Sequence, residues 1–306
     1  MAALVEVNTD GLAKLAETIS YALGGTARGE RKMAEAKAYA AELEAKTSNK
    51  VALIKAQGED ALANYVTAKE LRKMRNTIAV IEKAQSHFTE GETVSDEPVN
   101  EGWKNRFFNI VEEMSDEELR EIWGCVLAGE IKKPKSYSLR TLEVLRNLAI
   151  EEAAIIVKIA PYVIREEYIY RECPLTIEEN YTLQDCGILL DDGHSIQIGV
   201  DVKPHTQHAI TLDSKNTLIV HNDSDQMITY NLNIYTLSVA GQEIIKLVEE
   251  DKEIRNQVVN KLVQDLFSCG FSKVFKHRII KIDGDAIEFE DDGEEYKKAD
   301  MDPKGE

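Results

Sequence analysis

Four histidines of this chain are candidates for metal binding because of their type and spacing. His205 and His208 form an H-T-Q-H pair, and His194 and His221 lie in the same stretch, which is rich in β-forming residues. A zinc site needs three or four ligands that converge on one point. Two histidines in a polar loop do not supply such a set. We therefore interpret them as surface histidines and expect no metal site and no cofactor.

A second group that could do chemistry is the acidic segment DGDAIEFEDDGEEYKK near the C-terminus. It contains Asp283, Asp285, Glu288, Glu290 and Lys297, and acid pairs beside a lysine can hold Mg²⁺ in a nuclease. A tight hairpin turn at Asp283-Gly284 and an acidic tail explain the same residues without a cleft. We keep an Mg²⁺-dependent nuclease as an alternative function and assign no catalytic residue.

Common catalytic motifs are absent from the sequence. There is no G-x-x-x-x-G-K-[ST], no G-x-G-x-x-G and no G-x-S-x-G. The cysteines Cys125, Cys173, Cys186 and Cys269 are scattered without a C-x-x-C pair, which favours reduced thiols in the cytoplasm. Cys125 has no recognisable base partner, so we interpret it as a small core residue. The sequence thus favours a non-enzymatic protein.

The charge of the chain argues against nucleic acid as a partner. Its 306 residues carry 37 Lys and Arg against 55 Asp and Glu, a net charge of −18. Such a surface repels phosphate, so we do not expect the chain as a whole to bind nucleic acid. The N-terminal residues lack the basic start and apolar run of a secretion signal, and no window resembles a membrane span, which predicts a cytoplasmic protein.

Residue types that occur in active sites are concentrated in segment 115–148, SDEELREIWGCVLAGEIKKPKSYSLRTLEVLRNL. They include charged groups, hydroxyls, a Trp and a Cys. The helical spacing of its apolar residues nevertheless predicts that this segment forms a helical core. Ser115 to Glu118 match the S-x-x-E capping box, which predicts a helix from Asp116, and Ser136 or Ser138 is expected to cap the next helix. With the helices on either side, this segment predicts a compact bundle. The apolar faces expected to pack in it are Trp103, Phe107, Ile110, Val111; Leu119, Ile122, Trp123, Val126, Leu127; and Leu139, Leu142, Val144, Leu145, Leu148.

The N-terminal region 1–94 is predicted to be a helical arm that assembles subunits. It begins with a short amphipathic helix and continues as an Ala-, Glu- and Lys-rich helix with weak points near Ser48 and Gly58. Since such a helix has too few large apolar groups to be held by its own domain, we expect it to pack against another copy. A membrane contact by the first helix is an alternative. The predicted interaction residues are Leu12, Leu15, Ile19, Leu23, Arg28, Arg31, Lys32, Met33, Tyr39 and Leu43.

The fold class we predict is mainly α with a smaller β-containing part. The expected domains are the arm at 1–94, a central helical bundle at 95–172, an α+β region at 173–292 and a disordered acidic tail at 293–306. The α+β region has the order helix, strands, helix (239–270), followed by a hairpin, which resembles a winged-helix module. Its acidic residues favour a winged helix that contacts protein.

Several phrases together resemble one bacterial family known only as a domain of unknown function. They are GLAKLAETISYALGG, EIWGCVLAGEIKKPKSYSLRTLEVLRNL, LQDCGILL and LSVAGQEIIKL, and they would extend the match over most of residues 9–247. Members of this family are often found among prophage genes. The resemblance therefore implies a role in defence against phage, and it carries no catalytic residues with it.

From these observations we expect an oligomeric cytoplasmic interaction protein that senses or binds a protein ligand. A membrane-active effector that uses the N-terminal amphipathic helix is the first alternative, and the Mg²⁺-dependent nuclease is the second.

Overall fold

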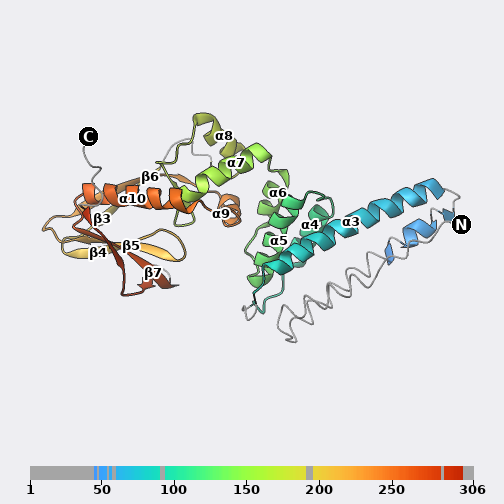
Figure 1. Ribbon diagram of the computed structural model, residues 1–306, viewed down its shortest axis with the longest axis horizontal. Coiled ribbons are helices and arrows are strands. Elements are labelled where there is room, and N and C mark those ends of the chain that lie inside the picture. The colour runs from blue at the N-terminus through green and yellow to red at the C-terminus, as the bar shows by residue number, and fades with distance from the viewer. Residues whose placement is uncertain are drawn as a thin grey trace. The chain divides into compact units, whose positions relative to one another are not determined.

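The chain folds into helices followed by a part rich in β-strands (Figure 1). The computed structural model describes residues 45–46, 48–53, 55–56, 60–89, 94–190, 196–283 and 286–298. Two compact units are formed by Met1–Leu142 and Glu143–Glu306. The boundaries predicted at 94/95 and 172/173 do not coincide with this division. The prediction of an α+β protein with helices first is confirmed.

Among its described residues, the first unit includes three long helices and the start of a fourth, besides the helical residues 45–46, 48–53 and 55–56. They are α3 (Asp60–Ser86), α4 (Glu101–Val111), α5 (Glu117–Lys132) and α6 (Leu139–Asn147). The α5 helix begins where its sequence predicts, but its cap is Asp116, whose side chain accepts hydrogen bonds from the amides of Glu118 and Leu119. The capping box predicted from Ser115 is wrong, since Asp116 is the residue whose carboxylate lies over the first turn. Ser138 caps α6 through the Thr141 amide.

An aromatic cluster forms the core of this unit. The Trp103 ring stacks on Phe107 at 4.9 Å between centroids, and Phe107 meets Trp123 edge-on at 5.7 Å. The Trp103 indole N–H donates to the backbone oxygen of Tyr137 at 2.8 Å, so its polar atom is satisfied. The core role predicted for both tryptophans is confirmed.

Two leucines predicted to lie in this core are exposed. Leu119 is 40% exposed and Leu139 is 48% exposed. Each lies in the first turn of its helix, α5 or α6. The spacing of apolar residues identifies which side of a helix faces the core. It does not show that the first turn of the helix lies beyond the neighbouring residues that would cover it, so these two predictions are wrong.

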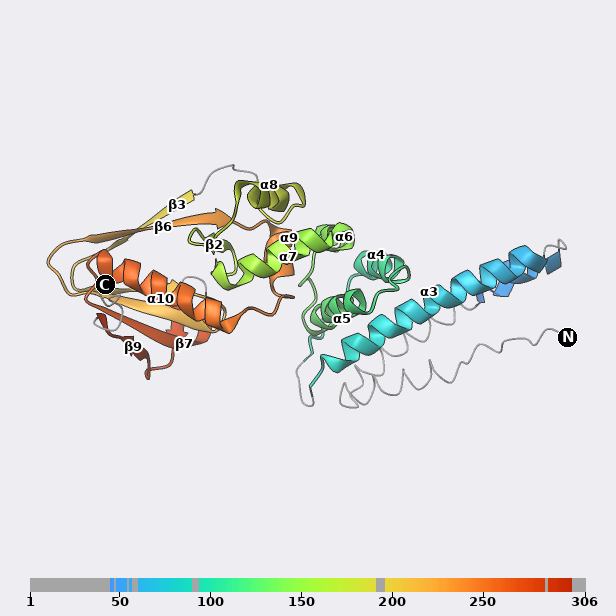
Figure 2. The ribbon, with the colours of Figure 1, turned by 45° about the horizontal axis from the view of Figure 1, so that its top comes forward.

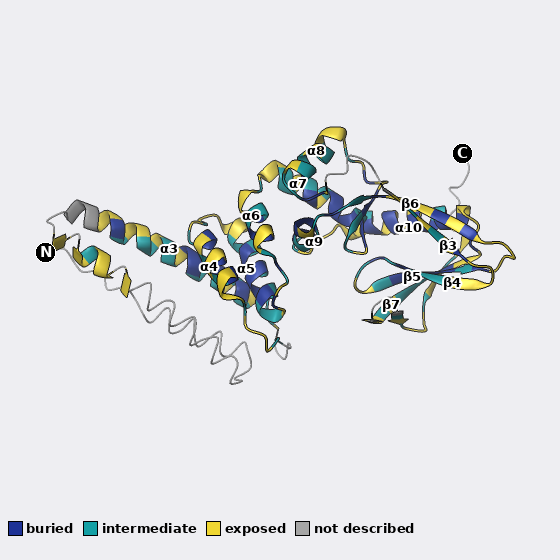
Figure 3. Cartoon of the chain, turned by 180° about the vertical axis from the view of Figure 1, so that it is seen from behind, coloured by how far each residue is buried: buried dark blue, intermediate teal, exposed yellow. Residues whose placement is uncertain are grey.

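The second half of α3 belongs to this core. Val80 and Ala84 are buried against it, and the buried Asn76 side chain donates to the Glu112 backbone oxygen and accepts from Arg120. The predicted arm at 1–94 is therefore not separate over its whole length. The first half of α3 extends beyond α4 and α5 (Figure 2) and is mostly exposed or intermediate (Figure 3).

The second unit is built from two antiparallel sheets and a long helix. The first sheet has the order β1-β2-β6-β3, and the second has the order β4-β5-β7-β8 with β9 also on β7. Its strands are β1 (Val163–Ile164), β2 (Tyr168–Tyr170), β3 (Ile196–Val202), β4 (Thr206–Thr211), β5 (Asn216–Asn222), β6 (Ile228–Thr236), β7 (Lys273–Asp283), β8 (Ala286–Phe289) and β9 (Glu294–Tyr296). Its helices are α7 (Ile150–Ile159), η1 (Ala160–Tyr162), α8 (Ile177–Asp185), α9 (Val239–Ile245) and α10 (Lys252–Ser268).

The buried face of α10 joins both sheets into one core. Val259, Leu262 and Leu266 of α10 pack in one cluster with residues of both sheets, among them Val220 of β5 and Tyr230 of β6. The alternating pattern of β6, in which every second residue is buried over 228–234, follows from its position against this core.

Two predictions for the C-terminal region need correction. The helix predicted over 239–270 is two helices, because Asp251 caps a new one by accepting from the amides of Glu253 and Ile254. The tail predicted to be disordered from 293 pairs with β7 at 294–296, where Tyr296 packs against the core. Residues 299–306 lie outside the described residues. Among the helices described, none has the length and apolar character needed to cross a membrane.

Candidate functional site

Helices α3 and α5 cross at Gly124, and the absence of a side chain there lets them come close together. A Cβ on Gly124 would stand 2.6 Å from the Lys83 Cβ and 2.9 Å from the Ala84 nitrogen. Only a residue without a side chain allows this approach. The crossing therefore brings the last turn of α3, and His87 directly after it, close to α5.

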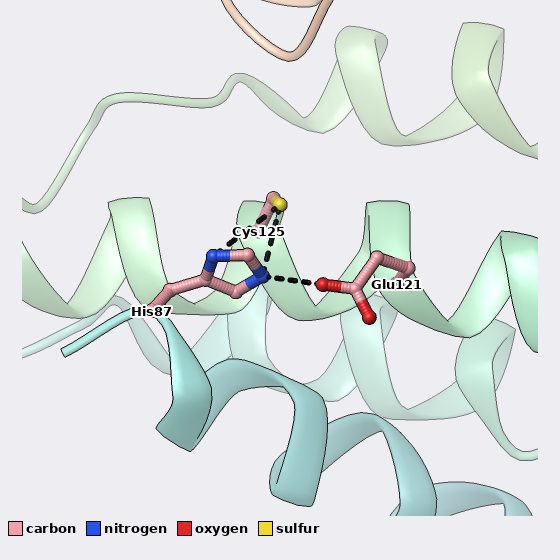
Figure 4. A group of neighbouring side chains, drawn as sticks. All are labelled: His87, Glu121 and Cys125. Atoms are coloured by element: carbon pink, nitrogen blue, oxygen red, sulfur yellow. Dashed lines mark hydrogen bonds and ion pairs between the residues drawn. The ribbon is translucent and has the colours of Figure 1, made fainter.

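Three side chains with chemically reactive atoms meet beside this crossing (Figure 4). The His87 Nε2 atom lies 3.1 Å from the Cys125 Sγ atom and 2.9 Å from the Glu121 Oε1 atom. One ligand atom from each residue can be chosen such that all three lie within 4.8 Å of one another. Within the described residues, no other group of histidine, cysteine and acidic side chains is gathered in this way.

Secondary structure explains why these three residues converge. Glu121 and Cys125 are four residues apart on α5, so they share one face of the helix. His87 follows the end of α3 at Ser86, and its backbone amide still donates to the Ala84 oxygen. The Lys132 ammonium holds the His87 backbone by donating to its oxygen at 2.7 Å.

Charged neighbours surround the group. The Lys83 ammonium lies 3.2 Å from Glu121 Oε2 and 2.9 Å from Glu117 Oε1. Hydrogen bonds to Glu117 and Glu121 raise the pKa of Lys83, and the hydrogen bond with Lys83 lowers the pKa of Glu117. Glu121 therefore uses one oxygen toward Lys83 and the other toward His87.

The surroundings of Cys125 favour its protonated thiol. Burial raises the pKa of its thiol above the ordinary 9.0, and the negative charge of Glu121 raises it further. A cysteine nucleophile needs the opposite shift, toward the thiolate at neutral pH. The geometry also differs from a catalytic triad, because the same ring nitrogen of His87 faces both the thiol and the carboxylate. The arrangement thus suits ligation better than nucleophilic attack.

The sequence interpretation of Cys125 needs correction. We expected a core residue without a base partner, but Cys125 is partly exposed and His87 is its neighbour. The two residues are 38 positions apart, and nothing in their local sequence connects them. The available signal was the E-x-x-x-C spacing on a predicted helix, which places two ligand types on one face.

The histidines singled out in the sequence do not form a site with a third ligand among the described residues. His205 is exposed at the start of β4 and pairs with Asp225 at 2.9 Å. His208 is half-buried, and this burial lowers its pKa. His221 lies on β5 beside Phe275, and His194 lies outside the described residues.

The acids near the C-terminal hairpin stay apart as well. Glu288 and Glu290 are exposed at β8, Lys297 is exposed after β9, and Asp285 lies outside the described residues. The predicted hairpin itself is confirmed by the pairing of Asp283 with Ala286. All ten predicted interaction residues also lie outside the described residues; they are Leu12, Leu15, Ile19, Leu23, Arg28, Arg31, Lys32, Met33, Tyr39 and Leu43.

One buried charge in the second unit was missed by the sequence analysis. Arg255 of α10 is buried, and its guanidinium donates to the backbone oxygens of Pro161, Val163 and Leu212. Asp213 lies 3.5 Å from the same guanidinium. Because its partners are backbone oxygens of η1, β1 and the loop after β4, Arg255 joins these segments to α10. Its role is structural.

Comparison with known proteins identifies one family. Residues 62–169 match the family described as "Protein of unknown function (DUF2806)". The match includes α3 to α7 and all three residues of the His87, Glu121 and Cys125 group. It confirms the resemblance to a domain of unknown function, over a shorter range than the one expected from the sequence. No curated protein and no solved structure matches the chain.

Proposed function

We propose that this chain, which carries a DUF2806 domain at residues 62–169, is a non-enzymatic cytoplasmic protein that assembles into homo-oligomers and binds a protein ligand. The exposed first half of α3 is the observation that carries this proposal. Together with the helical residues 48–53, it carries large apolar side chains that are exposed.

The apolar side chains in question are Leu53 and Tyr65, which are 64% and 65% exposed. Burying a side chain of this size between two copies would contribute about 1.5–3 kcal/mol. If helices of two copies packed together, these apolar side chains would be buried against apolar side chains of the other copy. Charge supports the same assembly, because the region 28–83 is locally basic whereas the chain carries a net charge of −18.

The oligomeric state of point variants tests this proposal without removing any part of the core. We expect the parent to sediment as an oligomer at micromolar concentration. The double variant Leu53→Glu/Tyr65→Glu is expected to sediment as a smaller species, since two buried carboxylates would oppose the contact.

The matched control is Met227→Glu, which changes another exposed apolar side chain, in the turn between β5 and β6. It should leave the oligomer intact. A monomeric parent, or a double variant that sediments like the parent, would contradict the assembly proposal.

We propose bacterial defence against phage as the biological setting. The support is the resemblance to a family found among prophage genes. Expression of the parent in a phage-sensitive bacterium should lower the plating efficiency of at least one phage in a diverse panel. The double variant Leu53→Glu/Tyr65→Glu should restore plating if assembly is needed. Unchanged plating across the panel would argue against this setting.

For residues 173–292 we propose a winged-helix-like module that contacts protein. The support is the order of α8, the strands and α9, together with exposed acids such as Asp201, Asp223 and Asp225. Acidic side chains oppose contact with phosphate. A labelled DNA duplex should therefore show no change in fluorescence anisotropy with the chain at 0.1 M salt, and tight binding would refute this part.

The two alternative functions stay predictions. The membrane-active effector depends on residues outside those described, and flotation of a Leu15→Glu/Ile19→Glu variant with liposomes would test it. The nuclease depends on acids that include the exposed Glu288. Equal Mg²⁺-dependent cleavage by the parent and by Glu288→Ala would remove that site.

A further inference from the structure

We propose that His87, Glu121 and Cys125 bind a divalent transition-metal ion, with zinc as the best fit. This inference does not depend on the oligomeric state proposed above. It starts from the three ligand atoms, which lie within 4.8 Å of one another on two packed segments of the first unit (Figure 4).

One ring nitrogen of His87 faces both other groups of the cluster. The His87 Nε2 atom is within contact distance of a thiol at 3.1 Å and a carboxylate oxygen at 2.9 Å. A neutral imidazole nitrogen either carries one proton and donates it, or offers one lone pair and accepts. It therefore cannot accept from the Cys125 thiol and donate to Glu121 at the same time. A cation between the three atoms would take a lone pair from each of them, and the thiol proton of Cys125 would be released to solvent as the thiolate binds.

The ligand types select the class of metal. Mg²⁺ and Ca²⁺ prefer sets of oxygen ligands, whereas one thiolate, one imidazole and one carboxylate form a mixed set typical of zinc and its neighbours. At tetrahedral zinc the sulfur and nitrogen ligands would stand about 3.5 Å apart and the nitrogen and oxygen ligands about 3.4 Å apart. The observed contacts of 3.1 Å and 2.9 Å need to widen by about half an ångström. The His87 ring must also turn, because the Cys125 Sγ atom lies 3.9 Å from Nδ1 as well and is therefore over the ring.

The fourth coordination position remains available to water. The side chains of His87 and Glu121 are 31% and 44% exposed, and Cys125 is also partly exposed. Structural zinc sites are closed by four protein ligands, whereas sites with three protein ligands keep one exchangeable position. The site is therefore of the open type, accessible to an external ligand.

The surroundings hold the ligands in place from outside the site. Lys83 binds the second oxygen of Glu121, and Lys132 binds the backbone oxygen of His87. Outer partners of this kind orient metal ligands. Both lysines also engage other groups, which are Glu117 for Lys83 and the Phe88 ring for Lys132.

Equilibrium dialysis of the full chain against zinc, after removal of metal with a chelator and with the thiols kept reduced, tests the site. We expect one zinc ion per chain in the parent. Each of the variants His87→Gln, Glu121→Gln and Cys125→Ser should bind zinc about tenfold or more weakly, because each removes one of three ligands.

Two matched controls separate this site from general binding by histidine or cysteine. His205→Gln removes an exposed histidine that contacts an acid, and Cys269→Ser removes an exposed cysteine. Neither should change the zinc affinity. A parent that binds no zinc, or a loss in these controls equal to the loss in the ligand variants, would overturn the proposal.

Cobalt substitution gives a second readout, which reports directly on the thiolate ligand. A Co²⁺ ion bound to a thiolate absorbs in the near ultraviolet through charge transfer from sulfur. The parent and Cys269→Ser should show this band, and Cys125→Ser should lack it. Cobalt bound to the parent without a thiolate band would exclude Cys125 as a ligand and overturn the proposed set.

Discussion

Gly124 of α5 lies so close to Lys83 of α3 that a Cβ on the glycine would stand 2.6 Å from the Cβ of the lysine. This contact sets the distance between the two helices. It also sets the position of His87, which follows α3 directly, relative to Glu121 and Cys125, which lie on either side of Gly124 along α5. The helix crossing and the candidate metal site therefore depend on the same glycine.

The first prediction is that Gly124→Ala both destabilises the first unit and weakens zinc binding. The new methyl group would meet backbone and Cβ atoms, so the helices must separate, at a cost of about 1–3 kcal/mol. Urea unfolding and zinc dialysis measure the two effects. Gly199→Ala is the control, because the nearest atom there is the Asn231 side-chain oxygen, which can move aside. Unchanged stability and zinc affinity in Gly124→Ala would contradict the role of the crossing.

The second prediction is that zinc raises the thermal stability of the parent but not of Cys125→Ser. A ligand that binds only the folded state stabilises it, by about 2.7 kcal/mol when its concentration is one hundred times Kd. A thermal scan with and without zinc measures the shift in Tm, and a chelator should reverse it. Equal shifts in the parent and in Cys125→Ser would mean that zinc acts elsewhere.

The third prediction concerns Arg255. Replacing it with methionine should lower the free energy of unfolding of the second unit by about 3 kcal/mol, because the buried backbone oxygens that accept from its guanidinium lose their donor. Urea unfolding measures the loss. Arg278→Met on β7 is the control, since Arg278 is exposed. A loss of the same size in both variants would show that the buried hydrogen bonds of Arg255 are not the cause.

The fourth prediction is a dependence of stability on pH through Glu179. The hydrogen bond from Lys158 lowers its pKa below the ordinary 4.5, and the Thr176 amide adds to this shift. A carboxyl group whose pKa is lower in the folded state stabilises that state above the unfolded pKa, and this stabilisation is lost as the pH falls through the folded pKa. Glu179→Gln should therefore flatten the decline in the free energy of unfolding below about pH 4.5.

Glutamine can still accept from the Thr176 amide, so this variant isolates the charge from the capping hydrogen bond. At neutral pH it should cost about 0.2–1 kcal/mol, the usual range for an ion pair near the surface. The exposed neighbour Glu178→Gln serves as the control, measured by urea unfolding over a pH series. An identical pH profile for Glu179→Gln and the parent would refute the assignment.

Local patterns in the sequence predicted most of the elements but not their limits. The α4 face of Trp103, Phe107 and Ile110 is buried as its spacing predicts, and the strands over 196–236 lie where alternation and turn residues place them. The errors fall at ends of elements. Asp251 divides one predicted helix into two, and Leu119 and Leu139 lie in exposed first turns. Periodicity carries no information about where the covering layer stops.

The sequence by itself determined the order of helices and strands, the aromatic core of the first unit and the resemblance to a domain of unknown function, which the family match over residues 62–169 confirms. Each of these features is indicated by patterns of residues that are close together in the sequence. Only the tertiary structure decided that His87 meets Cys125, since this depends on how closely two helices cross at Gly124. Contacts between residues 38 positions apart are set by packing, and packing is a property of the folded chain.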